Sequence, residues 1–207
     1  MKNNNNKEVY YFFKRIFDII FSFCVLIILF PLFILFAFII KIQSKGPVIY
    51  NWKVVGKNGI KFNSFKFRTM REDADSLKED LLNSNEMKGP FFKMTKDPRV
   101  TYFGRFLRKY SLDELPQFFS VFLGDMSIVG PRPPLQTEFE KFNEFEKRKM
   151  QVKPGITCLW QVEGRNSISE ASEWINKDLE YIEKQNFMLD LKIIFKTILT
   201  VLRGSGK

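Results

Sequence analysis

The chain contains no histidine among its 207 residues. This absence excludes a Ser-His-Asp triad and the histidine-based zinc sites of common hydrolases, so carboxylates must carry any acid-base step. Cysteine is scarce as well, because Cys24 and Cys158 are too few for a zinc cluster. Since Cys24 lies inside an apolar run, a disulfide between the two is not expected, and a reducing, cytoplasm-facing location fits best.

Acidic residues are outnumbered by basic ones. The 33 lysines and arginines against 23 acidic residues give a net charge of +10. This balance favours a polyanionic partner: nucleic acid, anionic lipid or a phosphorylated small molecule. Nucleic acid ranks last, because its binding needs exposed aromatic side chains interleaved with basic ones, and the phenylalanines are expected to be buried. At this length and with 45% hydrophobic residues, we expect one domain.

One long stretch, residues 19–40, has no charge at all. As a helix it would measure about 33 Å, enough to cross a bilayer core. Pro31 lies near its middle and would kink or break that helix. Basic residues flank both ends: Lys14 and Arg15 before the run, Lys41 and Lys45 after it. From these residues alone, a re-entrant hairpin with both ends on one side and a spanning helix are equally compatible.

The remainder predicts a small α+β domain that is mainly helical. Two short strands, at residues 48–50 and 61–70, flank an Asn58-Gly59 turn, as in a β-hairpin. Helices are expected at residues 72–88, before Arg108, from about Asp113 to Gly124, and at 187–203. We therefore divide the chain into a membrane-inserted segment, 1–45, and a catalytic domain, 46–207.

Two further helices are expected in the second half of this domain. Phe139, Phe142 and Phe145 share one face of an amphipathic helix, which suits either the core or the membrane interface. Ser167-x-x-Glu170 has the pattern of a capping box and would open the other helix.

Asp113 and Glu114 form an adjacent carboxylate pair after a basic segment. Ser111-x-x-Glu114 matches a capping box, whereas Pro116 favours a helix that begins at Asp113, where a proline costs no hydrogen bond. A carboxylate at a helix start beside Arg108 would stay ionised, which suits a nucleophile or a magnesium ligand and equally suits a simple helix cap. The residues alone leave both interpretations open.

Arg132 lies between Pro131 and Pro133. A proline-flanked loop can simply be a rigid turn. It can also hold a guanidinium on a stiff backbone, where the planar group offers two donors to a phosphate.

In their order along the chain, these pieces resemble the bacterial sugar transferases, the monotopic phosphoglycosyl transferases that act as polyprenyl-phosphate hexose-1-phosphate transferases. The resemblance covers nearly the whole chain and is carried by short motifs: Lys14-Arg15-x-x-Asp18, Lys66-Phe67-Arg68-Thr69-Met70, Asp97-Pro98-Arg99-Val100-Thr101, Gly104-Arg105-Phe106-Leu107-Arg108, residues 111–117, Gly124-Asp125-Met126-Ser127, residues 129–133, Lys153-Pro154-Gly155-Ile156-Thr157 and Gly164-Arg165-Asn166. An ordered series of this length is highly specific.

This resemblance implies an activity and its partners. A sugar-1-phosphate would pass from a nucleotide diphosphate sugar, expected to be a UDP-sugar, to undecaprenyl phosphate, releasing UMP. This is the first membrane step of a surface glycan such as exopolysaccharide, lipopolysaccharide or capsule. It places the chain at the cytoplasmic face of the bacterial inner membrane, in contact with membrane lipids, and leaves a homodimer as one option for its oligomeric state.

The resemblance also assigns roles to residues. Asp113 matches the nucleophile that forms a phosphosugar-aspartyl intermediate and helps to hold Mg²⁺, and Glu114 matches its catalytic partner. The remaining matches are the phosphate-binding residues Arg108 and Arg132, further substrate contacts at Lys66, Arg68 and Arg165, and headgroup anchors at Lys14 and Arg15. The apolar segment would be a hairpin that breaks near Pro31.

Two positions depart from the family pattern. Phe30 stands where a serine often precedes the proline, so a hydroxyl that would stabilise the break is absent, and Cys158 stands where glycine is frequent. Larger members carry extra N-terminal spanning helices, so this chain is expected to resemble a minimal catalytic unit. The competing hypothesis is a membrane-anchored, anion-binding scaffold in which the carboxylate pair only caps a helix.

Overall fold

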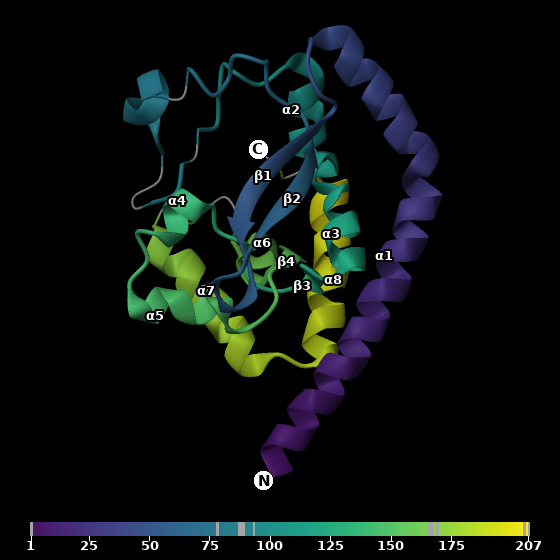
Figure 1. The fold of residues 1–207 in the computed structure, drawn as a ribbon, viewed down its shortest axis with the longest axis vertical. Helices are drawn as coiled ribbons and strands as arrows, with labels where there is room; N and C mark the ends of the chain where they lie inside the picture. Colours follow the sequence, from purple (N-terminus) through teal and green to yellow (C-terminus); the bar gives the residue numbers. More distant parts are fainter. Residues whose placement is uncertain are drawn as a thin grey trace.

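The computed structural model describes residues 2–77, 79–86, 90–92, 94–164, 168, 170–204 and 206, with the side chains of residues 2–6 and 82 left aside. Its elements are α1 (Lys2–Gln43), β1 (Ile49–Val55), η1 (Lys57–Gly59), β2 (Lys61–Phe67), η2 (Glu79–Ser84), α2 (Tyr102–Lys109), η3 (Leu112–Glu114), α3 (Gln117–Leu123), β3 (Ser127–Val129), α4 (Gln136–Phe139), α5 (Glu144–Lys147), η4 (Arg148–Gln151), β4 (Gly155–Thr157), α6 (Leu159–Glu163), α7 (Ala171–Lys184) and α8 (Phe187–Leu202). The prediction of a mainly helical α+β fold is confirmed (Figure 1).

The predicted β-hairpin is present. β1 and β2 pair antiparallel from Ile49 opposite Phe67 to Val55 opposite Lys61. Asn58 and Gly59 in the turn both have positive φ, at 57° and 78°, the conformation for which the Asn-Gly pair is favoured in tight hairpins. A second, parallel pair joins β3 to β4, with Ser127 opposite Gly155.

Three buried clusters hold the domain together. One surrounds Trp160 between α6 and α7, a second surrounds Met126 under α3, β3 and α8, and a third surrounds Leu107 between α1, β2 and α2. Leu107 is fully buried, and burial of such a side chain contributes roughly 1.5–3 kcal/mol. Because α1 side chains pack onto the second and third clusters, the long helix is part of the core.

α1 continues through Pro31 without the break that the sequence predicted. The helix bows around one side of the molecule, with its concave side on the domain (Figure 1). An interior proline removes one backbone hydrogen bond and bends a helix. Here the halves before and after Pro31 both pack on the domain, through Phe21 and Phe36 respectively, and this shared support explains why the helix bends and does not end.

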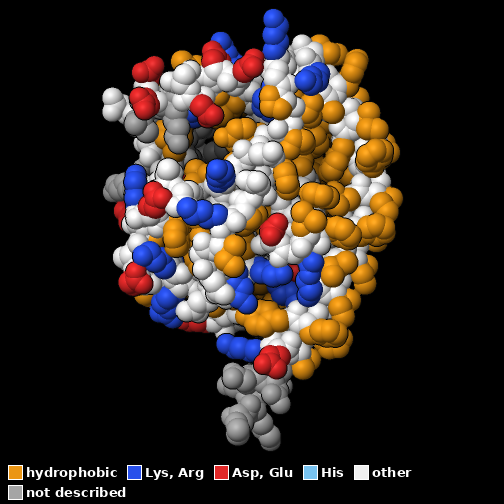
Figure 2. Space-filling model, in the orientation of Figure 1, with side chains coloured by type: hydrophobic (Ala, Val, Ile, Leu, Met, Phe, Trp, Pro, Cys, Tyr) orange, Lys and Arg blue, Asp and Glu red, His pale blue; other side chains and the backbone are white. Residues whose placement is uncertain are grey.

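The outer side of α1 is hydrophobic. In the described part of the chain, α1 is the one helix long and apolar enough to cross a membrane, over Lys7–Gln43, and only 11% of its most apolar window is buried. Figure 2 shows its hydrophobic side chains as a continuous band along one edge of the molecule. Such an exposed band needs a hydrocarbon environment, so this surface is suited to membrane association.

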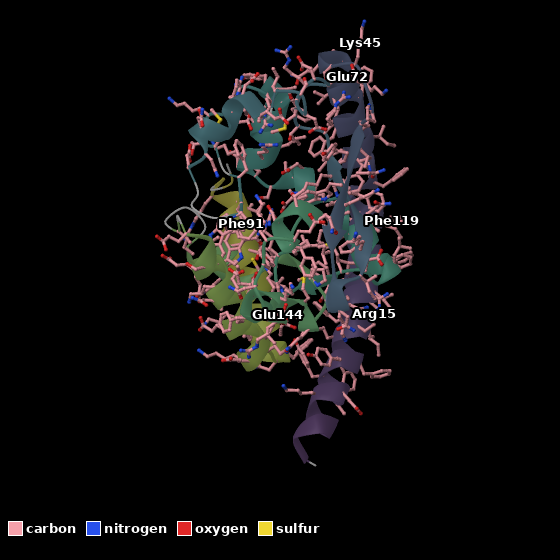
Figure 3. All side chains as sticks on the ribbon, turned by 60° about the vertical axis from the view of Figure 1, so that its left-hand side comes forward. Arg15, Lys45, Glu72, Phe91, Phe119 and Glu144 are labelled. Atoms are coloured by element: carbon pink, nitrogen blue, oxygen red, sulfur yellow. The ribbon has the colours of Figure 1, made fainter. Side chains whose placement is uncertain are left out.

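Both flanks of the apolar run contact the same domain. Arg15, before the run, donates to the carbonyl oxygens of Val121 and Phe122 at 2.7 and 2.9 Å, at the end of α3 (Figure 3). After the run, the Gln43 side-chain oxygen accepts from the Phe103 backbone N–H at 3.1 Å. Both ends of the apolar run are therefore attached to one domain.

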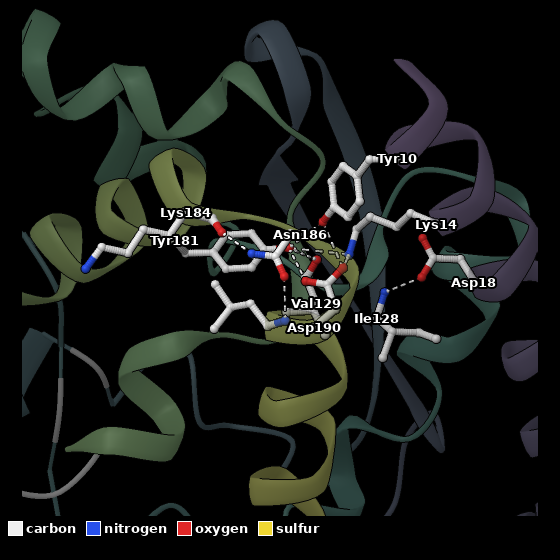
Figure 4. A network of polar contacts seen from close by, with 10 residues as sticks. Tyr10, Lys14, Asp18, Ile128, Val129, Tyr181, Lys184, Asn186 and Asp190 are labelled. Atoms are coloured by element: carbon white, nitrogen blue, oxygen red, sulfur yellow. Dashed lines mark hydrogen bonds and ion pairs between the residues drawn. The ribbon is translucent and has the colours of Figure 1, made fainter. Parts of the chain in front are cut away.

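A buried polar network fixes the first half of α1 to the last two helices (Figure 4). Asp190 of α8 accepts from Lys14 at 2.6 Å, from Tyr181 at 2.7 Å and from Tyr10 at 2.8 Å. Asp18, one helical turn after Lys14, accepts from the Ile128 backbone N–H of β3 at 3.0 Å. Each carboxylate is thus satisfied across a junction between distant segments, as buried charges require.

The segment after the hairpin is not the exposed α-helix that was predicted over 72–88. Its described part forms turns followed by the 3-10 helix η2. The Arg71 guanidinium binds the Asp73 carboxylate, and the Ser76 hydroxyl donates to the Asp73 carbonyl at 2.8 Å. Local bonds of this kind compete with helical hydrogen bonds.

The segment with three phenylalanines is also divided differently. It forms two short helices, α4 and α5, because Asn143 accepts from the Glu146 backbone N–H and starts a new helix. Phe142 is buried between them, while Phe145 is exposed, so the predicted common face does not exist. Ser167 of the expected capping box lies outside the described residues. Cys24 and Cys158 are free, as predicted.

We predict that Asp190→Ala will destabilise the protein by about 3–5 kcal/mol, because it leaves Lys14 buried without a counter-charge. The Lys14 and Asp190 side chains are only 11% and 5% exposed. The measurement is urea-induced unfolding in detergent micelles, followed by tryptophan fluorescence. Glu144→Ala is the control, since it removes an exposed pair with Lys147 and should cost less than about 1 kcal/mol. Equal losses for the two variants would contradict the role of the network.

Candidate active site

A cavity of about 520 Å³ opens between the hairpin, α2, η3 and the loop after β3. This volume is typical of small-molecule sites. Six of the predicted site residues line it: Lys66, Arg68, Arg108, Asp113, Glu114 and Arg132. Glu72, near the end of α1, and Phe91, deeper in the molecule, mark two of its walls (Figure 3). The fold thus brings together charged residues that are widely spaced in the sequence.

The carboxylate pair lies on η3, a single turn between α2 and α3. The predicted helix start at Asp113 is wrong, because α3 begins at Gln117 with Pro116 as its N-cap. Ser111 makes no capping bond either, and it has a φ of 52°, in the left-handed region that is uncommon for residues with a side chain. This turn joins α2 to α3 and places Glu114 within hydrogen-bonding distance of Lys66 on β2. Unusual backbone of this kind is concentrated at functional sites.

Glu114 is bound by a lysine of the hairpin. The Lys66 Nζ donates to Glu114 Oε1 at 2.6 Å and lies 4.3 Å from the centre of the Trp52 ring. Trp52 and Lys66 are diagonal neighbours on one face of the hairpin, because Trp52 pairs with Ser64 and Tyr50 with Lys66. The lysine is therefore held by a carboxylate and an aromatic face together, which fixes a positive charge at the cavity wall.

Arg108 is held beside the carboxylates by the hairpin. Its Nε donates to the Thr69 hydroxyl at 2.9 Å. Burial lowers the pKa of Arg108 from its ordinary value, and the negative charge of Asp113 opposes that shift. The guanidinium remains charged because its ordinary pKa is far above neutrality. A fixed cation next to Asp113, which is itself 92% buried, favours an ionised carboxylate.

Arg132 is held by a carboxylate other than those of Asp113 and Glu114. Its Nη1 lies 3.2 Å from Glu138 Oε2, and its guanidinium lies 5.5 Å from the centre of the Phe91 ring. Burial alone would lower the pKa of Arg132, but the charge of Glu138 more than offsets this and the pKa is raised. The loop of two prolines therefore presents an oriented cation to the cavity, and phosphate binding by Arg132 stays a prediction.

Arg68 connects the cavity to the end of α1. Its Nη2 donates to the Ser44 backbone oxygen at 2.7 Å and to the Ser44 hydroxyl at 2.8 Å. The Nε and Nη1 atoms of Arg68 are buried without a partner in the described part of the molecule. Unpaired buried donors are rare and costly, so this arginine retains hydrogen-bonding capacity for an anion.

Sequence reasoning missed the aromatic wall of the cavity. The Trp160 and Trp174 rings stack at 4.3 Å with an angle of 8°, and Phe91 packs on Trp174 at 5.2 Å. All three line the cavity. Trp174 and Phe91 are separated by many residues, so no local pattern indicated their contact. Thr69, which orients Arg108 from 39 residues away, was missed for the same reason. Glu138, which orients Arg132, lies only six residues away and was also missed.

Two of the described site residues are not at this cavity. Lys14 and Arg15 lie at the junction of α1 with α8 and α3, where protein groups bind both charges. Their role as headgroup anchors stays a prediction. Arg165 lies outside the described residues.

The cavity offers carboxylates to a divalent cation such as Mg²⁺. No group of three or more carboxylate or cysteine ligands occurs among the described residues. This suits Mg²⁺ all the same, because magnesium is commonly bound by one or two carboxylates together with substrate phosphates and water. Asp113 and Glu114 supply such a pair, and the surrounding cations supply sites for the phosphates.

Comparison with known proteins identifies relatives of the whole chain. A family profile described as "Bacterial sugar transferase" matches residues 9–204. The chain is 49% identical, over 79% of its length, to the galactosyl transferase CpsE of Streptococcus agalactiae serotype III. It is 39% identical to the exopolysaccharide production protein ExoY of Sinorhizobium fredii, over 93% of this chain, and 40% identical to the UDP-glucose:undecaprenyl-phosphate glucose-1-phosphate transferase of Klebsiella pneumoniae, over 90%.

The extent of these matches differs between relatives. The chain spans 36% of CpsE and 39% of the Klebsiella protein, but 87% of ExoY. The match to ExoY therefore covers most of both proteins, and the family profile covers nearly all of this chain. The chain belongs to the bacterial sugar transferase family.

Proposed function

We propose that the protein transfers a sugar-1-phosphate from a UDP-sugar to undecaprenyl phosphate and releases UMP, as an early membrane step of surface glycan synthesis. The observation that carries the proposal is a cavity in which Asp113 and Glu114 lie with five lysines and arginines: Lys66, Arg68, Arg71, Arg108 and Arg132. The Klebsiella relative, whose name gives this type of donor and acceptor, supports the choice of substrates. A pyrophosphate-containing donor requires several fixed positive charges, and the cavity supplies them.

Two displacements account for the reaction. In the first, an Asp113 carboxylate oxygen attacks the β-phosphorus of the donor, and the bond from that phosphorus to the bridging oxygen breaks and releases UMP. In the second, an oxygen of undecaprenyl phosphate attacks the same phosphorus and restores the free carboxylate. This order lets a soluble and a lipid substrate use one cavity in turn.

The surrounding residues stabilise charge and hold geometry. Arg108 and Arg132, each oriented by a protein partner, neutralise the phosphoryl oxygens as charge develops on them. Lys66 keeps Glu114 in place beside the nucleophile. Bound Mg²⁺, held by Asp113 with help from Glu114, would supply further neutralisation of the donor phosphates. Glu138 and Thr69 act only by positioning the two arginines.

The contacts of α1 support attachment to a single face of the membrane. Both flanks of the apolar run bind the catalytic domain, which favours the re-entrant over the spanning interpretation. We propose the cytoplasmic face, and the two free cysteines support it because free thiols suit a reducing compartment.

Asp113→Asn should reduce UMP release by at least about 1,000-fold, because it removes the attacking oxygen while keeping the shape of the side chain. UMP is measured after UDP-sugar and undecaprenyl phosphate are added to the protein in detergent. Without undecaprenyl phosphate, the wild-type chain should release UMP stoichiometrically and gain the mass of one phosphosugar. Asp80→Asn, an exposed acid outside the cavity, is the control and should be fully active. Full activity in Asp113→Asn would refute the assignment, and substrate binding without release by the wild type would favour the scaffold hypothesis.

Chelation of divalent cations should abolish UMP release, and added Mg²⁺ should restore it, because Asp113 and Glu114 in the cavity can share a cation with the donor. The measurement is the release assay in EDTA with a series of MgCl₂ concentrations. Undiminished release in EDTA would show that the lysines and arginines suffice.

To test the topology, Glu8→Cys and Lys45→Cys are made singly in a Cys24→Ser, Cys158→Ala background. Both introduced cysteines should lie on the cytoplasmic side of the membrane. Both positions are exposed and lie beyond the apolar run. Labelling is measured with a membrane-impermeant maleimide before and after cell lysis, and lysis should be needed for each. Reaction of one position in intact cells would establish a spanning helix.

A further inference from the structure

A second cavity, of about 260 Å³, lies away from the active site, where α1, the hairpin turn, β3 and the end of α7 meet. Four cations line it, Lys14, Arg15, Lys57 and Lys153, against the single carboxylate of Asp18. Asp18 is 98% buried and is bound to the backbone of Ile128. The wall of this cavity is therefore strongly positive.

The four cations are not equally neutralised. Lys14 is paired with Asp190. Among the described residues, neither Lys57 nor Lys153 forms an ion pair with a carboxylate. Burial lowers the pKa of Lys153, and the positive charges of Arg15 and Lys57 lower it further. An anion in this cavity would remove the repulsion that these charges exert on one another.

The geometry suits one tetrahedral anion. Gly124 ends α3 with a φ of 101°, and a side-chain carbon at this position would lie 3.0 Å from Arg15 Nη2 and 3.6 Å from Lys153 Nζ. The two nitrogens thus converge beside one point, close enough to bind different oxygens of one phosphate. Lys57 reaches the same cavity from the hairpin turn, with its Nζ 5.9 Å from the centre of the Tyr11 ring of α1.

Exposed apolar side chains border this cavity. Phe122 and Leu123, whose backbone adjoins the Arg15 contact, are 37% and 56% exposed, and Phe23 of α1 stacks on Phe122 at 6.0 Å. Figure 2 shows a cluster of lysine and arginine side chains directly beside the hydrophobic band. A phospholipid has the same order of groups, with its phosphate immediately above its acyl chains.

We propose that Arg15, Lys57 and Lys153 bind the phosphate of an anionic phospholipid, at a site separate from the active-site cavity. The acyl chains would lie along the exposed side of α1 and the end of α3. The proposal moves the headgroup contact from Lys14, which is paired internally, to two lysines of the domain. It does not depend on the proposed transferase activity.

The test uses the full chain in nanodiscs of phosphatidylcholine with a minor fraction of phosphatidylglycerol. After transfer to detergent, native mass spectrometry measures which lipid stays bound. The wild type should retain phosphatidylglycerol in preference to phosphatidylcholine. The double variant Lys57→Gln, Lys153→Gln should bind it roughly 30-fold more weakly, since each lysine near a lipid phosphate contributes about five-fold.

The matched control is Lys53→Gln, Lys61→Gln, which removes two charges from exposed positions of the same hairpin outside the cavity. It should retain lipid as the wild type does, and urea unfolding should show that both double variants are folded. Equal retention in all three proteins, or equal loss in both variants, would overturn the site. A third arm titrates inorganic phosphate in place of lipid. Binding of free phosphate at these lysines without any lipid preference would also overturn the assignment to a phospholipid.

Discussion

The candidate active site depends on lysine and arginine side chains that the folded chain holds in fixed positions. Arg108, Arg132 and Lys66 each bind a partner from a different segment: Thr69, Glu138 and Glu114. A mobile cation must be ordered when a phosphate binds, and that ordering reduces the binding free energy. Here the order is already present in the folded chain. The loss of side-chain conformational entropy therefore occurs during folding, where burial of the hydrophobic clusters that bring the segments together offsets it.

Contacts at both ends of α1 also hold charged side chains in fixed positions. Arg68 joins the active-site cavity to Ser44 at the end of α1, and Lys14 joins the first half of α1 to Asp190 of α8. Buried ion pairs add little net stability in comparison with apolar packing, but they disfavour every arrangement that leaves one charge unpaired. These contacts therefore fix the position of α1 along the domain. Because Arg68 lines the cavity and is bound to Ser44 just after α1, the position of the membrane helix and the shape of the active site are linked.

Sequence patterns predicted the elements whose conformation depends on residues adjacent in the chain. The Asn58-Gly59 turn and Gly124 need backbone angles that few residues adopt, so the hairpin and the end of α3 were predicted well. The identity of the site residues came from the ordered motifs. The start of α3 at Gln117 and the course of α1 through Pro31 were not predicted. The second depends on packing of both halves of α1 against residues far away in the sequence. The aromatic wall of the cavity was not predicted either, because Trp160 stacks on Trp174 of the next helix.

The absence of histidine takes on a physical meaning in this structure. The proposed transfer to a carboxylate needs no histidine as a base, and the favourable interaction between the charges of Arg108 and Asp113 suits an anionic nucleophile. The leaving group is a phosphate, which departs as a stable anion and needs no strong acid. What remains to be supplied is neutralisation of charge, and lysine and arginine supply it across the whole neutral pH range. A site of two carboxylates among oriented cations is therefore chemically sufficient for the proposed reaction, and imidazole would add only a titration that the reaction does not use.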